Sequence, residues 1–96
     1  MYALVGVVCV KPGHEEEVAA MTREHGPGLV TGMNGSKAAY WARTVDTDDI
    51  FQHSLWLFEL EADARAAETV FSSLRDLPDA PAVFVSVEVC ELIAQM

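Results

Sequence analysis

The chain is predicted to fold as one α+β domain with a ferredoxin-like βαββαβ arrangement. Hydrophobic residues alternate with a period of two in four segments and recur every three to four residues in two others. Read in order, these segments are strand, helix, strand, strand, helix and strand, which is the order of a split βαβ repeat with an antiparallel sheet. The 96 residues suffice for a single hydrophobic core, so one domain is expected over residues 1–96.

The first strand is predicted over residues 2–10, because a valine-rich, nearly continuous apolar run is typical of an inner strand covered on both faces. A helix is predicted over residues 14–25, with three glutamates in its first turn, where the helix dipole favours negative charge. The Gly-Pro-Gly sequence at 26–28 is expected to end this helix. Residues 29–35 fit either a short strand or an ordered loop.

Two strands are predicted around an acidic hairpin loop at 46–49. In the strand over residues 36–45, Tyr40 and Ala42 alternate with Trp41 and Arg43. In the strand over residues 50–60, both faces carry large apolar groups, so both faces should be covered. One face holds Phe51, His53, Leu55 and Leu57, and the opposite face holds Ser54, Trp56 and Phe58.

A second helix is predicted over residues 62–77, and the prolines at 78 and 81 end it because proline cannot continue a helix. Its apolar stripe consists of Ala67, Val70, Phe71 and Leu74. The last strand is predicted over residues 82–93. Strict alternation would place Val83, Val85, Val87 and Val89 on one face and Phe84, Ser86, Glu88 and Cys90 on the other.

Both helices are expected on one side of the sheet, because βα crossovers are right-handed. The other face would then expose more apolar surface than the few hundred Å² typical of a monomer. A second copy related by a two-fold axis would cover it. We therefore expect a homodimer in which two sheets pair through their faces.

The composition indicates an acidic protein of the cytoplasm. Fifteen acidic side chains against six basic ones give a formal net charge of −9, which repels nucleic-acid phosphates and anionic lipid. Neither nucleic acid nor a membrane is therefore expected as a partner. No apolar run reaches the ~18 residues of a membrane span, and no export signal is recognised at the N-terminus. No metal site is predicted, since the histidines are far apart and neither cysteine has a nearby ligand partner.

Several motifs resemble the antibiotic biosynthesis monooxygenase superfamily of dimeric α+β barrels, and together they cover nearly the whole chain. They are the turn Lys11-Pro12-Gly13-His14-Glu15, the break Gly26-Pro27-Gly28-Leu29, and the strand Ser54-Leu55-Trp56-Leu57-Phe58-Glu59 that enters a helix at Glu61-Ala62. The resemblance implies a homodimer whose two sheets pair as a dimeric α/β barrel, with one pocket per subunit between helices and sheet. By position, Gly6, Ser54, Trp56 and Phe58 would line that pocket.

Members of that family include cofactor-free oxygenases of aromatic polyketides and haem-degrading enzymes. The chain departs from the haem-degrading members, whose second-helix histidine has no counterpart in residues 66–74 and whose first-strand asparagine falls at Gly6. The family's frequent tryptophan at the end of the third strand aligns with Phe58, while Trp56 lies two residues earlier on the same face. Haem is therefore disfavoured as a substrate, and if the chain is an enzyme the resemblance implies an oxygenase that uses no cofactor.

The resulting hypothesis is a cofactor-independent monooxygenase acting on an aromatic or polyketide-type metabolite. Trp56, Phe58 and Tyr40 would hold the ring, with Trp41 beside them, although all four could equally be core or interface residues. His53 could transfer a proton, since histidine titrates near neutral pH, or it could make a hydrogen bond across the dimer seam.

Arg43 could bind a carboxylate or an enolate, or pair with an acidic neighbour. Two alternative functions follow from the same fold. One is a non-catalytic binding or assembly module, favoured if the cavity has no polar atom beyond Ser54. The other is a polyketide cyclase that would use Arg43 and His53 together.

Overall fold

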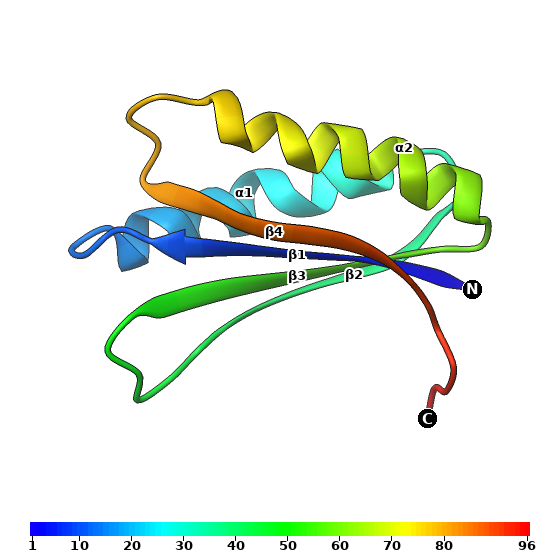
Figure 1. The fold of residues 1–96 in the computed structure, drawn as a ribbon, viewed down its shortest axis with the longest axis horizontal. Coiled ribbons are helices and arrows are strands. Elements are labelled where there is room, and N and C mark those ends of the chain that lie inside the picture. The colour runs from blue at the N-terminus through cyan, green and yellow to red at the C-terminus, as the bar shows by residue number, and fades with distance from the viewer.

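The computed structural model describes all 96 residues as a sheet covered on one face by two helices (Figure 1). The elements are β1 Tyr2–Val10, α1 Glu15–Thr31, β2 Ser36–Arg43, β3 Ile50–Phe58, α2 Glu61–Ser72, a 3₁₀ helix Ser73–Asp76 and β4 Ala82–Glu91. The strand order is β2-β3-β1-β4, and every neighbouring pair is antiparallel. The predicted α+β class and ferredoxin-like element order are therefore confirmed.

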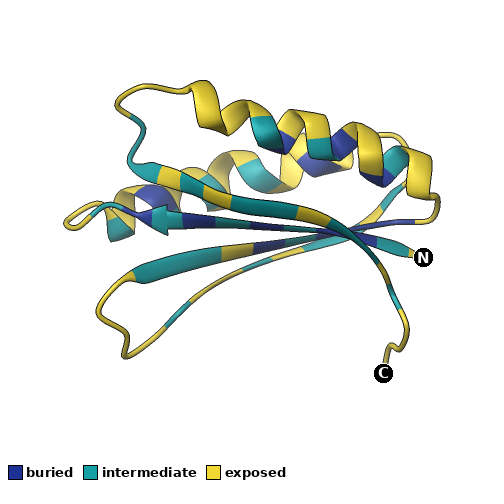
Figure 2. Ribbon diagram, viewed as in Figure 1, coloured by how far each residue is buried: buried dark blue, intermediate teal, exposed yellow.

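The two faces of the sheet differ in what covers them. We call the side toward α1 and α2 the helix face and the opposite side the open face. Strand register assigns each residue to one of them: Leu4 lies opposite Trp56 on the helix face, and Val7 lies opposite His53 on the open face. Figure 2 shows the buried residues of α2 on the side that meets the sheet, with exposed residues on its outer side.

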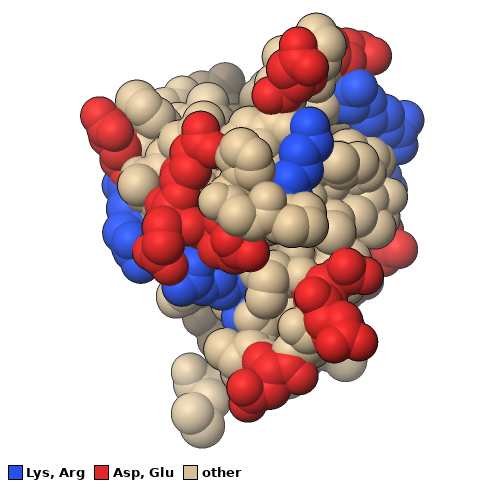
Figure 3. Space-filling view, turned by 90° about the vertical axis from the view of Figure 1, so that its left-hand side faces the viewer, with Lys and Arg blue, Asp and Glu red and all other residues tan.

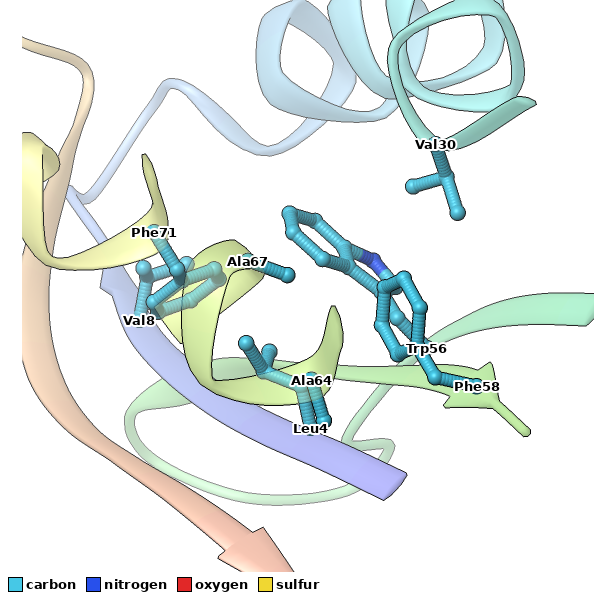
Figure 4. Packing of buried hydrophobic residues seen from close by; sticks show 8 residues of the cluster. All are labelled: Leu4, Val8, Val30, Trp56, Phe58, Ala64, Ala67 and Phe71. Carbon is cyan, nitrogen blue, oxygen red and sulfur yellow. The ribbon is translucent and has the colours of Figure 1, made fainter. Parts of the chain in front are cut away.

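The hydrophobic core lies between the helix face and the helices (Figure 4). Alternate residues of β1 and β3 meet one stripe from each helix, which is why period-two and period-3.6 patterns share one core. The buried cluster consists of Leu4, Val8, Val30, Trp56, Phe58, Ala64, Ala67 and Phe71.

The prediction that the Gly-Pro-Gly sequence ends the first helix was wrong, because α1 continues through it to Thr31. Two glycines and a proline lower intrinsic helix stability by on the order of 5 kcal/mol relative to alanine. Tertiary packing offsets this cost. Val30 is only 3% exposed and lies in the core cluster. Gly26 lets α1 approach β2, since a Cβ built there would lie 3.0 Å from the Trp41 ring.

The face assignment predicted for the second half of the last strand was also wrong, because β4 contains a bulge. Val7 pairs with Ser86 whereas Val8 pairs with Phe84, so Val85 is an extra residue without a partner. Residues beyond the bulge therefore change faces. Phe84, Val87 and Val89 pack against the core, and Ser86 and Glu88 lie on the open face.

The remaining element ends differ little from the predicted ones. The last turn of the second predicted helix is the 3₁₀ helix, and β2, β3 and β4 end at Arg43, Phe58 and Glu91. Neither helix has the length and apolar character required to cross a membrane. Carboxylate groups lie in several separate clusters over the end of the molecule shown in Figure 3. No group of three or more potential ligands is arranged to hold a metal ion.

Candidate functional site

A cavity of about 430 Å³ lies between the two helices and the helix face of the sheet. One wall comes from α1, through residues such as Met21 and His25, and the other from α2 and the segment that follows it, through residues such as Leu74. The sheet provides the floor, with Val8 at its centre and Trp41 toward the β2 edge. The volume falls within the range of about 300–1,000 Å³ that is usual for small-molecule pockets.

Four aromatic rings form a continuous row along this cavity. Trp41 meets Trp56 with ring centroids 6.5 Å apart, and Trp56 meets Phe71 at 5.6 Å. Phe71 in turn lies 6.0 Å from Phe84. The interplanar angles of 64°, 75° and 56° are those of edge-to-face and tilted pairs, the geometry that aromatic side chains prefer. The row fixes the rings before any ligand arrives, so the cavity presents a preformed aromatic surface.

The rim of the cavity is apolar and exposed. Five of its large aliphatic side chains are between 38% and 55% exposed although they line the cavity: Met21, Leu29, Val70, Leu74 and Leu77. Apolar side chains gathered around a concave site are typical of a binding surface rather than of random exposure. An apolar molecule seated between the helices would cover them.

Polar side chains are few, and all but Ser73 lie on the α1 and β3 side of the cavity. Ser73 lies on the α2 side, where its hydroxyl donates a 2.6 Å hydrogen bond to the Val70 carbonyl. Ser54 is 4% exposed, and its hydroxyl makes no hydrogen bond within the protein. The side-chain amide of Gln52 donates a hydrogen bond of 3.0 Å to the hydroxyl of Thr22. His25 is the only titratable residue of the lining, which contains no carboxylate, ammonium or guanidinium group. The cavity therefore offers neutral hydrogen-bonding groups and almost no charge.

The indole nitrogen of Trp56 is buried without a hydrogen-bond partner. Figure 4 shows this nitrogen on the side of the ring that faces Val30, whose side chain has no acceptor. An unsatisfied buried donor costs about 1–3 kcal/mol. A ligand oxygen or a water molecule that reached this edge of the ring would supply the missing acceptor.

Three of the predicted substrate-binding residues line the cavity together: Trp41, Ser54 and Trp56. Phe58 is fully buried in the core and does not reach the cavity. Gly6 lies on the helix face but is covered by Phe71, since a Cβ built on it would overlap that ring. Gly6 therefore makes room for an aromatic wall and does not line the cavity itself.

The structure does not bring the other predicted residues to the cavity. Tyr40 and His53 lie on the open face, on the side of the sheet opposite the cavity. Arg43 lies on the helix face at the end of β2, where its guanidinium donates a 3.1 Å hydrogen bond to the Glu16 carboxylate and a 3.4 Å hydrogen bond to the Glu15 carbonyl. Arg43 and His53 point to opposite faces, so the pair that a cyclase would use is not assembled.

Sequence reasoning missed several cavity residues. Gln52 follows from the same alternation that selects Ser54 and Trp56, so the signal for it was present in β3. Thr22 lies on the inward side of α1 next to Gln52. The helical spacing of Val18, Met21, Thr22 and His25 predicts one inward stripe on the first helix, and all four residues line the cavity, although the stripe alone does not distinguish core from cavity. Phe71 and Phe84 could be placed in the core but not in one aromatic row.

The fold and the cavity define a class of protein: a small α+β, ferredoxin-like domain with a preformed apolar site on its helix face. Comparison of the sequence with models of known protein families gives no match, and comparison with curated protein sequences also gives none. The function is therefore argued from the residues and geometry of the cavity.

Proposed function

We propose that the chain binds a planar, apolar small molecule in the cavity between its helices and its sheet. The observation that carries the proposal is the row of four aromatic rings beneath an exposed aliphatic rim. A flat ring system would stack or pack edge-on against that row and bury the rim. Hydrophobic and aromatic surroundings with a few placed polar groups are typical of ligand pockets.

The polar groups of the ligand are expected to be uncharged. No acidic or basic side chain other than His25 lines the cavity, so an ammonium would lose its hydration without gaining a counter-charge, and a carboxylate would find only the His25 imidazole. Hydroxyl or carbonyl groups would instead pair with the free Ser54 hydroxyl and with the Thr22–Gln52 pair. Because these groups lie on one side of the cavity, the ligand should carry its polar atoms along one edge.

Tryptophan fluorescence tests the proposal, because both tryptophans of the chain line the cavity. Dihydroxynaphthalene and larger planar analogues should change the emission in a saturable way. Trp41→Leu should weaken binding about tenfold, equivalent to about 1.4 kcal/mol, with Trp56 left as the reporter. Tyr40→Leu is the matched control, since Tyr40 directly precedes Trp41 in β2 and lies on the open face.

The control should bind like the parent protein. Equal losses of affinity in Trp41→Leu and Tyr40→Leu would contradict the proposed location. Saturable binding of none of the planar compounds would contradict the proposed ligand class.

A second candidate function is cofactor-independent oxygenation of the same ligand. The cavity holds polar side chains beyond Ser54, namely Thr22, His25, Gln52 and Ser73, so the condition that favoured a purely non-catalytic module is not met. In such a reaction the ligand is the reductant of O₂. A base removes a proton from a CH₂ group, the carbanion transfers electrons to O₂, one oxygen atom ends as the carbonyl, and the other leaves as water.

His25 is the only lining residue that could act as the base, and His53 and Arg43 take no part in this scheme. The assay is O₂ consumption by the purified protein with an anthrone, which carries a suitable CH₂ group. His25→Ala should lower the rate while the fluorescence-detected affinity stays the same. Binding of the anthrone without O₂ uptake above the buffer blank would contradict the oxygenase function and leave ligand binding as the only proposed function of the cavity.

We also propose that the protein is a homodimer joined through its open faces. Tyr40 and Val83 on this face are each more than half exposed. Four strands about 4.8 Å apart and about 27 Å long give the face a flat area on the order of 500 Å², without the additional area of protruding side chains. Patches near the upper end of the range found on monomers, about 300–600 Å², often mark an interaction site, and a second copy related by a two-fold axis would cover this one.

A further inference from the structure

The open face carries one acidic and one basic residue in otherwise uncharged surroundings. Among the paired residues of its strands, the only imidazole is that of His53 on β3, the only carboxylate is that of Glu88 on β4, and lysine and arginine are absent. The remaining residues of the face are aliphatic or aromatic, or are small or weakly polar groups such as Ser86, Cys9 and Cys90. Lys37, which lies in the bulge of β2, pairs with Glu59 at 3.2 Å.

Neither charged residue of the open face has a partner within the chain. His53 and Glu88 are exposed, and neither takes part in a side-chain hydrogen bond or an ion pair. If the face is covered, a buried charge without a counter-charge is strongly unfavourable. A cover that presents a carboxylate to His53 and a hydrogen-bonding donor or cation to Glu88 avoids this cost.

The register places these two residues on either side of the central strand β1. His53 lies opposite Val7 across one side of β1, and Glu88 lies opposite Val5 across the other. Two strand spacings and one two-residue step separate them by about 12 Å, too far for a pair within one chain. When two open faces stack, a two-fold axis can lie between the two sheets, over β1 between Val5 and Val7 and perpendicular to the line from His53 to Glu88. This axis exchanges the two positions, so each His53 lies against the Glu88 of the other copy.

We infer that the open face is a self-complementary interface for a second copy of this chain, oriented by two symmetric pairs between His53 and the partner's Glu88. The inference rests on the proposed dimer and specifies its orientation. Apolar side chains supply the area, but they fit many registers. Opposite charges that meet in only one register favour that register, because other alignments leave them unpaired or set like charges together.

Cross-linking tests the juxtaposition directly. Cys9 and Cys90 are free thiols on the same face, so the background carries Cys9→Ser and Cys90→Ser. His53→Cys and Glu88→Cys chains are then mixed and treated with a short bismaleimide. The mixed dimer should cross-link, because position 53 of one chain meets position 88 of the other while the second pair keeps its native residues. Cross-linking of either variant alone, as efficient as in the mixture, would overturn the inferred orientation.

Charge exchange provides a second, independent test by sedimentation equilibrium. Glu88→Lys should weaken the dimer at least tenfold, because a lysine would then face His53. Asp48→Lys in the exposed β2–β3 loop makes the same change of net charge and should leave the dimer as in the parent. The double variant His53→Glu/Glu88→Lys should restore dimerisation, since a glutamate again meets a cation.

The outcomes separate this inference from the dimer on which it rests. A parent protein that sediments at 10.5 kDa would contradict the dimer itself. A dimeric parent with Glu88→Lys no weaker than Asp48→Lys, or with no recovery in the double variant, would leave the dimer in place and overturn the His53–Glu88 pairs.

Discussion

The contact between Gly6 and Phe71 makes a quantitative prediction about how β1 and α2 support the cavity. A Cβ added at Gly6 would overlap the end of the Phe71 ring and lie 2.5 and 2.6 Å from its two Cε atoms. The ring cannot simply move aside, because Trp56 lies 5.6 Å away on one side and Phe84 6.0 Å away on the other. Gly6→Ala therefore forces either the aromatic row or α2 to shift.

The expected destabilisation follows from two opposing effects. Overpacking a well-filled core costs about 1–3 kcal/mol, and an overlap this close belongs at the upper end. Replacing a strand glycine by alanine returns about 0.5–1 kcal/mol, because the unfolded chain loses conformational freedom. The free energy of unfolding of Gly6→Ala should thus fall by about 2 kcal/mol.

Urea unfolding followed by tryptophan fluorescence measures this change, with an unchanged m value as the sign that both end states are preserved. The matched control is Gly32→Ala at the end of α1, where the nearest atoms to an added Cβ lie at an ordinary 3.6 Å. In a Phe71→Leu background the obstructing ring is absent, so Gly6→Ala should lower the free energy of unfolding by less than it does beside Phe71. Parent-like stability of Gly6→Ala, or equal costs in both backgrounds, would refute the close packing of Gly6 and Phe71.

Three further predictions concern α1. Gly28→Ala should raise the free energy of unfolding by about 1 kcal/mol, because an added Cβ meets nothing within 4 Å and alanine favours a helix; urea unfolding with no gain would contradict the helical state of this segment. Val30→Ala should lower stability by about 1–3 kcal/mol, since it leaves space beside Trp56; a neutral result would show that the end of α1 is not docked. Hydrogen bonds from the backbone N–H groups of Glu15 and Gly13, with smaller contributions from His14 and Arg43, lower the pKa of Glu15. The resulting stabilisation is present above the pKa that Glu15 has in the unfolded chain, and it is lost as the pH falls through the pKa of Glu15 in the folded protein. A ¹³C NMR titration of the Glu15 carboxyl with a midpoint at or above that of an ordinary glutamate would contradict this prediction.

The features of the fold that depend on local pattern could be predicted from the sequence. The bounds of β1 and the faces of β2 and β3 follow from alternation, which already separates His53 from Ser54 and Trp56. Alternation does not say which face meets the helices. That choice depends on long-range packing, and it decides whether a residue reaches the cavity.

The features that could not be predicted are those in which tertiary contacts override a local rule. A Gly-Pro-Gly sequence normally ends a helix, yet α1 continues because Val30 docks into the core. A bulge leaves no mark in a valine-rich alternating strand, so the exchange of faces after Val85 was invisible. The aromatic row joins rings from β2, β3, α2 and β4, and no local pattern connects them.

The central claim is that a planar ligand binds on the helix face, beside the two tryptophans. The two indole N–H signals in a ¹H–¹⁵N spectrum test it directly during titration with dihydroxynaphthalene. Both signals should shift on binding, with the larger change at Trp56, whose buried N–H has no acceptor in the free protein. Shifts confined to open-face residues such as Tyr40 and His53, with both indole signals unmoved, would contradict the account.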